Sequence, residues 1–589
     1  MDNQRNLIVA VVLCLALLLG FDFAMGRLYP QPTATSTARH EVAEAPTSKA
    51  AAKHIRDGGL VDPAEQAAEV RDLATALAAP GRLRIDAPEV AGSISPVGAR
   101  VDDIVLKTHR QTVDKDSGPV RMFSPAGTPA ESYAQFGWVG TGVTVPTPRT
   151  VWQVQGTQLT PKTPVTLTWD NGQGQTFSIR YAIDQYYMLT VDQTVANRAA
   201  GSVALRPYAF ISRTSRTASQ DTWNLHSGPI GNFGGSVDFD NNYSDVDEAG
   251  TISPEGRTNW IGFTDIYWLS ALVPQDGART TGDFRALGAE DYRADVIYDP
   301  VTLATGKQVT RTTRLFAGAK ESKVLDRYED GGVSNFGLAI DWGWFYWFMV
   351  PIFALLRSLY SLTGNFGVAI ILLTVIVRGV MFPIAQKQFA SMAQMRAVQP
   401  KMKALQERYK DDKPKLQGEM AKLYKDEGVN PLAGCLPIFL QIPIFFALYK
   451  TLMVAIEMRH KPFALWIHDL SAPDPLMILN GFGLLPFTPP SFLSLGILAL
   501  LLGITMWLQF RLNPAALDPV QQQVFSIMPW MMMFVMAPFA SGLLIYWITS
   551  NLLTVAQQQY LYSRHPQLKE QIAKDREDKA RAAKSGAKE

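Results

Sequence analysis

The chain has 589 residues, too many for one ordinary domain, and a net charge of only +2. Long apolar runs gather in residues 364–562, whereas residues 28–335 have the composition of a soluble protein. Both cysteines, Cys14 and Cys435, lie in apolar segments, which excludes a disulfide framework in the soluble region between them.

The N-terminus is expected to be a membrane anchor. Arg5 precedes an apolar run from Leu7 to Phe21, which is typical of a signal peptide or an uncleaved signal anchor. No clean cleavage pattern follows, so we favour an uncleaved anchor over residues 1–27 and keep the cleaved signal peptide as the alternative. Residues 28–90 then form a linker, in which Asp62, Pro63 and Glu65 predict the start of a short Ala-rich helix.

Residues 91–335 show the alternation of apolar and polar residues that is typical of β-strands. Apolar side chains alternate with threonines from Val165 to Trp169, and they alternate again from Phe177 to Ile183. The Asp-Asn-Gly-Gln-Gly stretch around Gly172 joins the two runs, which predicts a β-hairpin. Many such short strands predict a large all-β sandwich domain.

Catalytic and metal-binding motifs are missing from the sequence. It contains no phosphate-binding loop, zinc-protease motif or serine-hydrolase elbow. The acidic stretch from Asp238 to Glu248 lacks the pattern of an EF-hand loop, so we interpret it as a solvated loop. His460 and His468 have no third ligand nearby. We expect no catalytic residue, metal or cofactor, and no sign of nucleic-acid recognition.

Residues 336–363 are predicted to form an amphipathic helix at the membrane interface. The run 342–362 is rich in aromatic residues and contains Pro351 and Arg357, and such a composition favours the interfacial region over a full crossing.

Five later apolar runs, within a core over residues 364–562, are expected to cross the membrane: 366–386, 433–456, 493–511, 524–540 and 541–562. Their orientation follows from the basic residues. The loop 387–430 carries ten Lys and Arg and the tail 563–589 carries eight, whereas the 457–492 loop has only Arg459 and Lys461. With the N-terminal anchor there are six spans, which leave both termini in the cytoplasm and the β-domain outside.

Arg378 is a charge inside the apolar run 366–386. An arginine at membrane depth costs roughly 2.5–3.5 kcal/mol on insertion scales, so it either reaches the headgroups or faces a polar cavity. Further polar residues lie at similar depths: Thr374, Gln441, Gln509, Ser550, Asn551 and the glutamines at 557–559. Each of these residues could form a hydrogen bond between helices, but together they predict a polar pocket in the inner half of the bilayer.

The basic loop 387–430 is predicted to form a hairpin of two amphipathic helices joined at residues 411–414. Met392, Met395 and Met402 recur at helical spacing on its apolar side. Methionine suits an adaptable binding surface, yet the same pattern is expected if these residues form the packing seam of the hairpin itself. Both interpretations remain open at this point.

The membrane half closely resembles the YidC family of bacterial membrane protein insertases. The stretches that carry the resemblance are IVRGVMFPIAQKQFASMAQMRAVQPKMKALQERY (376–409), NPLAGCLPIFLQIPIFFALY (430–449), PFALWIHDLSAPDP (462–475) and SGLLIYWITSNLLTVAQQQ (541–559). More weakly, 259–274 and 92–106 resemble the periplasmic domain of the Gram-negative form.

The resemblance implies a polytopic α-helical membrane protein whose five-helix insertase core encloses a hydrophilic groove, open to the cytoplasm and to lipid. Arg378 matches the groove arginine of the family, and Thr374, Gln509 and Trp547 match positions that line the groove. Tyr546-Trp547 differs from the Tyr-Tyr pair of some members. With the polar residues above, the expected substrate groove consists of Arg378, Thr374, Gln441, Gln509, Tyr546, Trp547 and Asn551.

The same resemblance implies a function and partners. The protein is expected to insert and help fold proteins of the bacterial inner membrane, alone or with the Sec translocon. Its expected partners are nascent membrane proteins, Sec components, the ribosome with the signal-recognition targeting machinery, and the lipid bilayer. The periplasmic domain is expected to be a sugar-binding-like sandwich, and the basic tail a ribosome contact. Three other classes of protein are disfavoured by features that the sequence lacks. It shows no internal repeat of a solute transporter, no cytoplasmic signalling domain of a periplasmic receptor and no catalytic pair of a membrane hydrolase.

Overall fold

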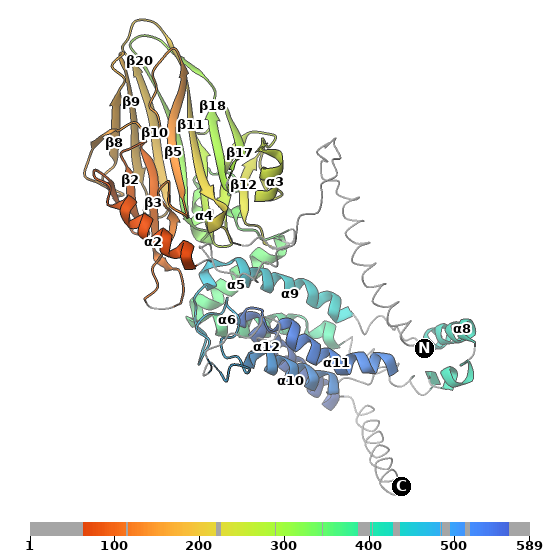
Figure 1. Cartoon of the computed structure of the whole chain (residues 1–589). Coiled ribbons are helices and arrows are strands. Elements are labelled where there is room, and N and C mark those ends of the chain that lie inside the picture. Colours follow the sequence, from red (N-terminus) through yellow and green to blue (C-terminus); the bar gives the residue numbers. More distant parts are fainter. Residues whose placement is uncertain are drawn as a thin grey trace, which may run out of the picture.

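The computed structural model describes residues 63–564, apart from 114–115, 220–224, 289, 344–345, 387–397, 399–400, 403, 411, 428–435, 483–484, 486–494 and 513–518. In Figure 1 the described chain forms an upper part of strands and a lower part of helices. We call them the β-domain (residues 82–341) and the helical part (residues 346–564). The predicted anchor at 1–27, the linker up to residue 62 and the tail from 565 onward lie outside the described residues.

The β-domain contains two large sheets. The strands of the first sheet are β1 (Leu83–Asp86), β2 (Val90–Ser95), β3 (Arg100–Arg110), β4 (Pro119–Phe123), β5 (Ser132–Thr141), β7 (Gln158–Leu159), β11 (Val203–Thr214), β14 (Thr251–Ile252), β17 (Thr280–Gly288), β18 (Asp291–Tyr298) and β19 (Val301–Leu303). Their order is β14-β17-β18-β11-β5-β3-β2-β1-β7, with β19 beside β11 and β4 beside β3. The sheet therefore begins at Leu83, before the expected domain boundary at residue 91.

The second sheet has nine strands. They are β6 (Gln153–Gln155), β8 (Val165–Asp170), β9 (Gln175–Ile183), β10 (Met188–Asn197), β12 (Gly228–Phe233), β13 (Ser236–Asp238), β15 (Thr258–Thr264), β16 (Trp268–Pro274) and β20 (Lys307–Ala319). Their order is β13-β12-β15-β16-β20-β10-β9-β8-β6. The predicted hairpin is confirmed, because β8 and β9 pair antiparallel and Gly172 between them has a φ of +69°.

The core of the β-domain lies between the two sheets. Along β9, buried residues alternate with partly exposed ones, as expected for a strand with one face inward. Trp138 of β5 meets Phe177 of β9 edge-on at 5.2 Å, and the Tyr181 hydroxyl donates to the Ala99 carbonyl at 2.7 Å. These contacts join the sheets face to face, which confirms the predicted all-β sandwich.

Short helices border the sandwich: α2 (Pro63–Leu77), α3 (Tyr243–Ala249), α4 (Ser322–Asp330), and the 3-10 turns η1 (Ser215–Thr217) and η2 (Phe336–Ala339). The predicted Ala-rich helix is α2, and its Glu69 accepts a hydrogen bond from the Ala130 amide at 2.9 Å. The solvated loop expected at Asp238–Glu248 is wrong in part, because Asn242 and Asp245 form a capping box that starts α3.

The helical part contains α5 (Tyr346–Thr363), α6 (Phe366–Val380), α8 (Lys413–Asp426), α9 (Leu436–Val454), η4 (Ile456–Met458), α10 (Ile497–Leu512), α11 (Pro519–Met536) and α12 (Ser541–Arg564). A turn at Met381 follows α6, and helix resumes over 382–386. The helices α6, α9, α10, α11 and α12 coincide with the five predicted apolar runs.

The predicted number of spans is not confirmed. Within the described ranges, no helix is both long and apolar enough to cross a membrane. The helix that carries Arg378 is an example: α6 has 15 residues, about 22 Å at 1.5 Å per residue, against a hydrocarbon core of about 30 Å.

Helix α5 occupies the predicted interfacial segment. It buries Met349, Phe353 and Leu356 against the neighbouring helices, while Trp347 and Leu362 are exposed. This amphipathic division is compatible with a helix that lies along an interface.

Helix α8 belongs to the predicted hairpin and lies apart from the other helices in Figure 1. Its N-cap is Asp412, whose side chain accepts from the Lys415 amide, at the predicted joint. Val398 and Met402 are buried against Met420, Leu423 and Tyr424. Met402 therefore belongs to the hairpin's own packing seam, whereas Met392 and Met395 lie outside the described residues.

Candidate functional site

Arg378 lies near the end of α6, where its side chain reaches α12. Its Nε donates to the Ser550 hydroxyl at 3.2 Å, and Nη2 donates to the same oxygen. The Gln557 side-chain amide, two turns further along α12, donates to the Arg378 carbonyl at 3.4 Å. The arginine is therefore turned toward a neighbouring helix and is not extended along its own helix toward the headgroups.

A second polar contact joins α9 to α12 beside the first. The Gln441 amide donates to the Tyr546 hydroxyl. Tyr546 lies one helical turn before Ser550, so both polar groups of α12 occupy the same face of that helix. Gln441, Tyr546, Ser550 and Arg378 thus form a polar cluster across three helices, which we call the polar groove after the groove that the family resemblance implies.

Asn551 extends these contacts toward α10. Its side-chain amide donates to the Thr505 hydroxyl at 3.3 Å, and both residues are buried. This pair is a hydrogen bond between helices, which is the simpler role expected for an isolated polar residue in an apolar segment.

The other expected groove residues are placed differently. Thr374 is buried, but its hydroxyl donates to the Ile370 carbonyl of its own helix at 2.7 Å. Trp547 packs against Phe445 of α9 with ring centroids 5.1 Å apart. Gln509 is half-buried, and among the described residues it has no hydrogen-bond partner. The structure thus brings Arg378, Gln441 and Tyr546 together, but it does not bring Gln509 to them.

Arg378 lacks a counter-ion in the described part of the chain. No Asp or Glu carboxylate of these residues lies within ion-pair distance of it. Its guanidinium donates to the Ser550 hydroxyl, and only its backbone carbonyl meets the Gln557 amide. The half-buried guanidinium, which bonds to the Ser550 hydroxyl, retains unused hydrogen-bonding capacity, because the group carries five N–H donors. The groove can therefore offer a charged donor to an acidic group that enters it.

Two members of these contacts were not among the residues of the expected substrate groove, although Ser550 was one of the polar residues expected to form the pocket. Ser550 is the side-chain partner of Arg378, and its signal in the sequence was the four-residue spacing from Tyr546. Thr505 is the partner of Asn551. A lone threonine in an apolar helix is too common to be predicted as a site residue.

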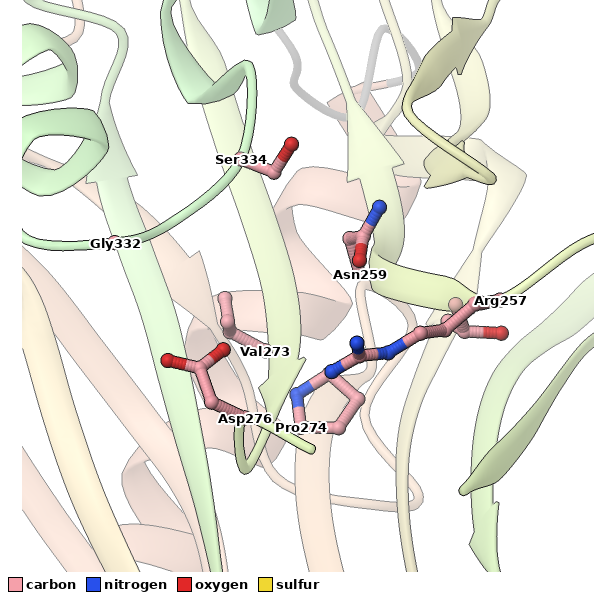
Figure 2. Close-up of a pocket in the computed structure, with 8 residues that line it drawn as sticks. Arg257, Asn259, Val273, Pro274, Asp276, Gly332 and Ser334 are labelled. Atoms are coloured by element: carbon pink, nitrogen blue, oxygen red, sulfur yellow. The ribbon is translucent and has the colours of Figure 1, made fainter. Parts of the chain in front are cut away.

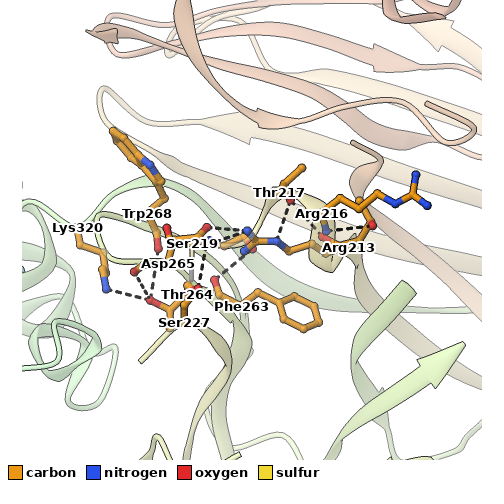
Figure 3. Close-up of polar contacts among 12 residues, drawn as sticks. Arg213, Arg216, Thr217, Ser219, Ser227, Phe263, Thr264, Asp265, Trp268 and Lys320 are labelled. Carbon is orange, nitrogen blue, oxygen red and sulfur yellow. Dashed lines mark hydrogen bonds and ion pairs between the residues drawn. The ribbon is translucent and has the colours of Figure 1, made fainter. Parts of the chain in front are cut away.

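Two polar features of the β-domain have structural explanations. Figure 3 shows Asp265, which accepts from the Ser219 amide and, with both carboxylate oxygens, from Nη2 of Arg213 at 2.9 and 2.8 Å. Figure 2 shows a pocket lined by Asn259 and Ser334 among others. Its surroundings are also held by internal bonds, since Asn259 donates to Asn232 at 2.8 Å and Asn232 donates to the Ser334 carbonyl. Both features tie loops to the sandwich.

Metal chemistry has no visible support in the described residues. They contain no group of three or more His, Cys, Asp or Glu side chains that could hold a metal ion. His460, one of the two histidines considered above, lies 3.9 Å from Asp469, and the burial of its ring together with nearby Arg459 lowers its pKa to about 4. That histidine is therefore neutral at physiological pH.

Family models match both parts of the chain. The model of the 60Kd inner membrane protein matches residues 358–570, and the model of the YidC periplasmic domain matches residues 82–355. The border between them falls inside α5, close to where the β-domain ends and the helical part begins.

Curated relatives match over nearly the full length. A membrane protein insertase YidC of Zymomonas mobilis is 43% identical over 590 residues and covers 99% of both chains. The insertase of Bradyrhizobium diazoefficiens is 41% identical, covering 96% of this chain and 97% of its own. That of Ruegeria is 47% identical, with 81% and 82% covered.

Among solved structures, an active YidC insertase with its first transmembrane domain resolved covers 82% of this chain and 94% of its own. At 17% identity and a TM-score of 0.34, this likeness adds no structural argument. The matching models and the full-length relatives at 41–43% identity decide the assignment. The chain belongs to the YidC family of membrane protein insertases, with its periplasmic domain and its 60Kd inner membrane protein region both present.

Proposed function

We propose that this chain inserts inner-membrane proteins by way of the polar groove of Arg378, Gln441, Tyr546 and Ser550. The observation that carries the proposal is Arg378, a charged group turned toward α12 with no carboxylate partner among the described residues. A permanent partner would neutralise the arginine. A hydroxyl partner leaves the charge available to each passing substrate.

The groove would act by lowering the barrier to moving a short polar segment of the substrate. Polar side chains and water in the inner leaflet reduce the thickness of hydrocarbon that the segment has to cross. Arg378 offers an acidic segment a transient charged donor. Burial of the substrate's apolar span in lipid, at about 25 cal/mol per Å², then drives its release, so that no nucleotide is required.

The topology belongs to the same proposal. We infer six spans: an N-terminal anchor and the segments that contain α6, α9, α10, α11 and α12, with α5 at the interface. The charge distribution supports this arrangement, since it leaves the basic loop 387–430, the basic tail and both termini in the cytoplasm. Exposed apolar side chains on α6, α10, α11 and α12 supply a lipid-facing surface, among them Val375, Ile504, Phe534 and Leu552.

Partners follow from the same arrangement. Nascent membrane proteins would be the substrates, delivered by the ribosome and the signal-recognition targeting machinery. The basic tail and the hairpin that contains α8 would face these factors in the cytoplasm. The β-domain, on the other side of the membrane, would contact Sec components.

The proposal is tested by depleting the cellular insertase, supplying this chain, and following a single-span substrate with a short translocated tail. The Arg378→Gln variant is expected to insert an acidic-tailed substrate about tenfold more slowly, which corresponds to about 1.4 kcal/mol of lost stabilisation. Insertion of a matched substrate with an uncharged tail should change much less.

The matched control is Arg511→Gln on α10, an exposed arginine outside the groove that stacks on Trp507. It removes the same charge from the same part of the protein. Failure of this chain to restore insertion after depletion would contradict the insertion role. Equal losses with Arg378→Gln on acidic and uncharged tails would contradict charge pairing.

A further inference from the structure

The last part of the β-domain, which follows β20 and leads into α5, is the segment of residues 320–343. It contains α4 and η2, and we call it the junction segment. In Figure 1 α4 lies at the lower end of the sandwich, above the helices. Both parts of the molecule form hydrogen bonds with this segment, so it is placed to transmit the position of one part to the other.

Lys320 ties the junction segment to the second sheet. It is 2% exposed, and its ammonium donates to the Thr264 hydroxyl at 3.0 Å and to the Ala339 carbonyl at 3.3 Å. Figure 3 shows Lys320 beside the group of contacts around Asp265. Since Lys320 bonds the end of η2 to the end of β15, the segment returns to the sheet before it leaves for α5.

Asp341 lies just after η2, and its carboxylate accepts hydrogen bonds from three donors. Its Oδ2 accepts from the Lys450 ammonium of α9 at 2.8 Å and from the His226 amide of the β-domain at 3.3 Å. Its Oδ1 accepts from the Gly343 amide at 3.1 Å. The Lys450 and Asp341 side chains are 10% and 18% exposed, so the ion pair is largely shielded from water.

The charges make this carboxylate difficult to replace. Burial lowers the pKa of Lys320 to about 8, and the charge of Asp341 opposes that shift. Without Asp341, one of the negative charges that oppose the repulsion between Lys450 and Lys320 would be missing. Removing the carboxylate from this shielded ion pair is expected to be destabilising, because it takes a negative charge away from Lys450.

A second set of contacts fixes the end of α9. Glu457 of η4 accepts from the Ser322 amide at 3.0 Å and from its hydroxyl at 2.7 Å. Arg357 of α5 donates to the same hydroxyl at 2.8 Å. The Arg459 guanidinium donates to the Arg110 and Gln111 carbonyls at the end of β3, at 2.8 and 3.0 Å.

Helix α9 connects this junction to the polar groove. Gln441, which bonds to Tyr546, precedes Lys450 by about 14 Å along the helix axis. A helix held at one end by the β-domain presents its other end in a defined position. We propose that Asp341 is a positioning residue that locks α9 to the β-domain through Lys450, and thereby holds Gln441 in the groove of the proposed function, on which this inference rests.

The test measures whether α9 loosens when Asp341 loses its charge. In the full chain, with Cys14 and Cys435 replaced by serine, a single cysteine is placed at Ala447, which is fully buried on α9. Asp341→Asn is expected to increase maleimide labelling of Ala447→Cys several-fold. Lys450→Met should increase it similarly, Lys450→Arg should not, and the double variant should be no worse than either single variant.

Two controls separate the junction from general unfolding. A cysteine at Ala209, fully buried in β11, should stay protected in every variant. Asp192→Asn removes a carboxylate that pairs with Arg180 within the second sheet at 3.2 Å, and it should leave labelling of Ala447→Cys unchanged. If Asp341→Asn exposes both probes, the Lys450→Met variant is used to test whether loss of the ion pair alone exposes Ala447→Cys. Unchanged labelling in that variant, or additive effects in the double variant, would overturn the proposal.

Insertion of the acidic-tailed substrate is measured on the same variants. Asp341→Asn should slow insertion several-fold, with Arg378→Gln as the reference. If Arg378→Gln slows insertion and Asp341→Asn does not, the lock fails and the groove stands. If neither variant slows insertion while Ala447→Cys becomes accessible, the proposed groove fails and the lock between Asp341 and α9 stands.

Discussion

The β-domain and the helical part both bury charged side chains, but they satisfy them differently. In the β-domain, Arg213 meets Asp265 with two hydrogen bonds, and the Ser219 amide adds a third to the same carboxylate. In the helical part, the half-buried Arg378 guanidinium donates to the Ser550 hydroxyl and meets no carboxylate among the described residues. Complete pairing stabilises a fold, whereas incomplete pairing leaves a group available for a transient ligand.

The largest effect is expected from breaking the complete pair. Asp265→Asn leaves the Arg213 guanidinium buried without its carboxylate, which should lower the free energy of unfolding of the β-domain by about 3–5 kcal/mol. Denaturant unfolding of the purified protein, followed through a β-domain probe, measures it. A matched double variant, Arg213→Met with Asp265→Leu, should recover most of the loss. A drop below about 1 kcal/mol in Asp265→Asn would mean that the pair is not what organises this end of the sandwich.

A smaller, pH-dependent effect is expected at the border of the two parts. Burial raises the pKa of Glu457, and its charged neighbours are Glu321 and, through the Ser322 hydroxyl, Arg357. A carboxyl with a raised pKa in the folded state contributes stability at acidic pH, and that contribution is lost as the pH rises through the folded-state pKa. The native protein should therefore become less stable between acidic and neutral pH.

Glu457→Gln should flatten this dependence, because glutamine does not titrate and can still accept the two hydrogen bonds from Ser322, each worth about 1 kcal/mol. At neutral pH the variant is expected to be as stable as the native protein or more so, and at acidic pH the difference should disappear. Thermal unfolding across that pH range measures it. If the variant loses the same stability at every pH, the titration of Glu457 does not cause the pH dependence, and the side chain contributes only through packing and hydrogen bonds.

The smallest effect on stability is expected at the groove. Arg378→Gln should change the free energy of unfolding by less than about 1 kcal/mol, because the arginine has one neutral side-chain partner and forms no described ion pair. Thermal unfolding of the detergent-solubilised protein measures it, beside the insertion assay above. A loss as large as that of Asp265→Asn would remove the contrast between the two parts and assign Arg378 a structural role.

Local patterns in the sequence predicted most of the individual elements. The alternation from Val165 to Ile183 predicted the β8–β9 hairpin, and Asp62-Pro63 predicted the start of α2. The apolar runs gave the places of α6, α9, α10, α11 and α12. These signals are short-range, since alternation, capping and apolar runs each depend on a few neighbouring residues. The capping box of α3 was missed because acidic residues in a loop and at a helix start look alike.

The groove residues could be named only as a set. Apolar context made Arg378, Gln441 and Asn551 conspicuous, and the family resemblance added Tyr546, Trp547, Thr374 and Gln509. Which polar group meets which depends on the rotation of each helix about its axis. That rotation brought Ser550 to Arg378 and Thr505 to Asn551, but gave Gln509 no partner in the described residues.

The sequence by itself determined the division into a β-rich and an apolar helical half, the family, and the basic segments from which the proposed orientation follows. These properties depend on local composition, which can be analysed without knowing which elements pack together. Only the tertiary structure decided that Asp341 meets Lys450, residues more than a hundred positions apart, and that Met402 packs within its own hairpin. Such pairings depend on how whole sheets and helices pack, because a buried charge is stable only where the fold brings its partner.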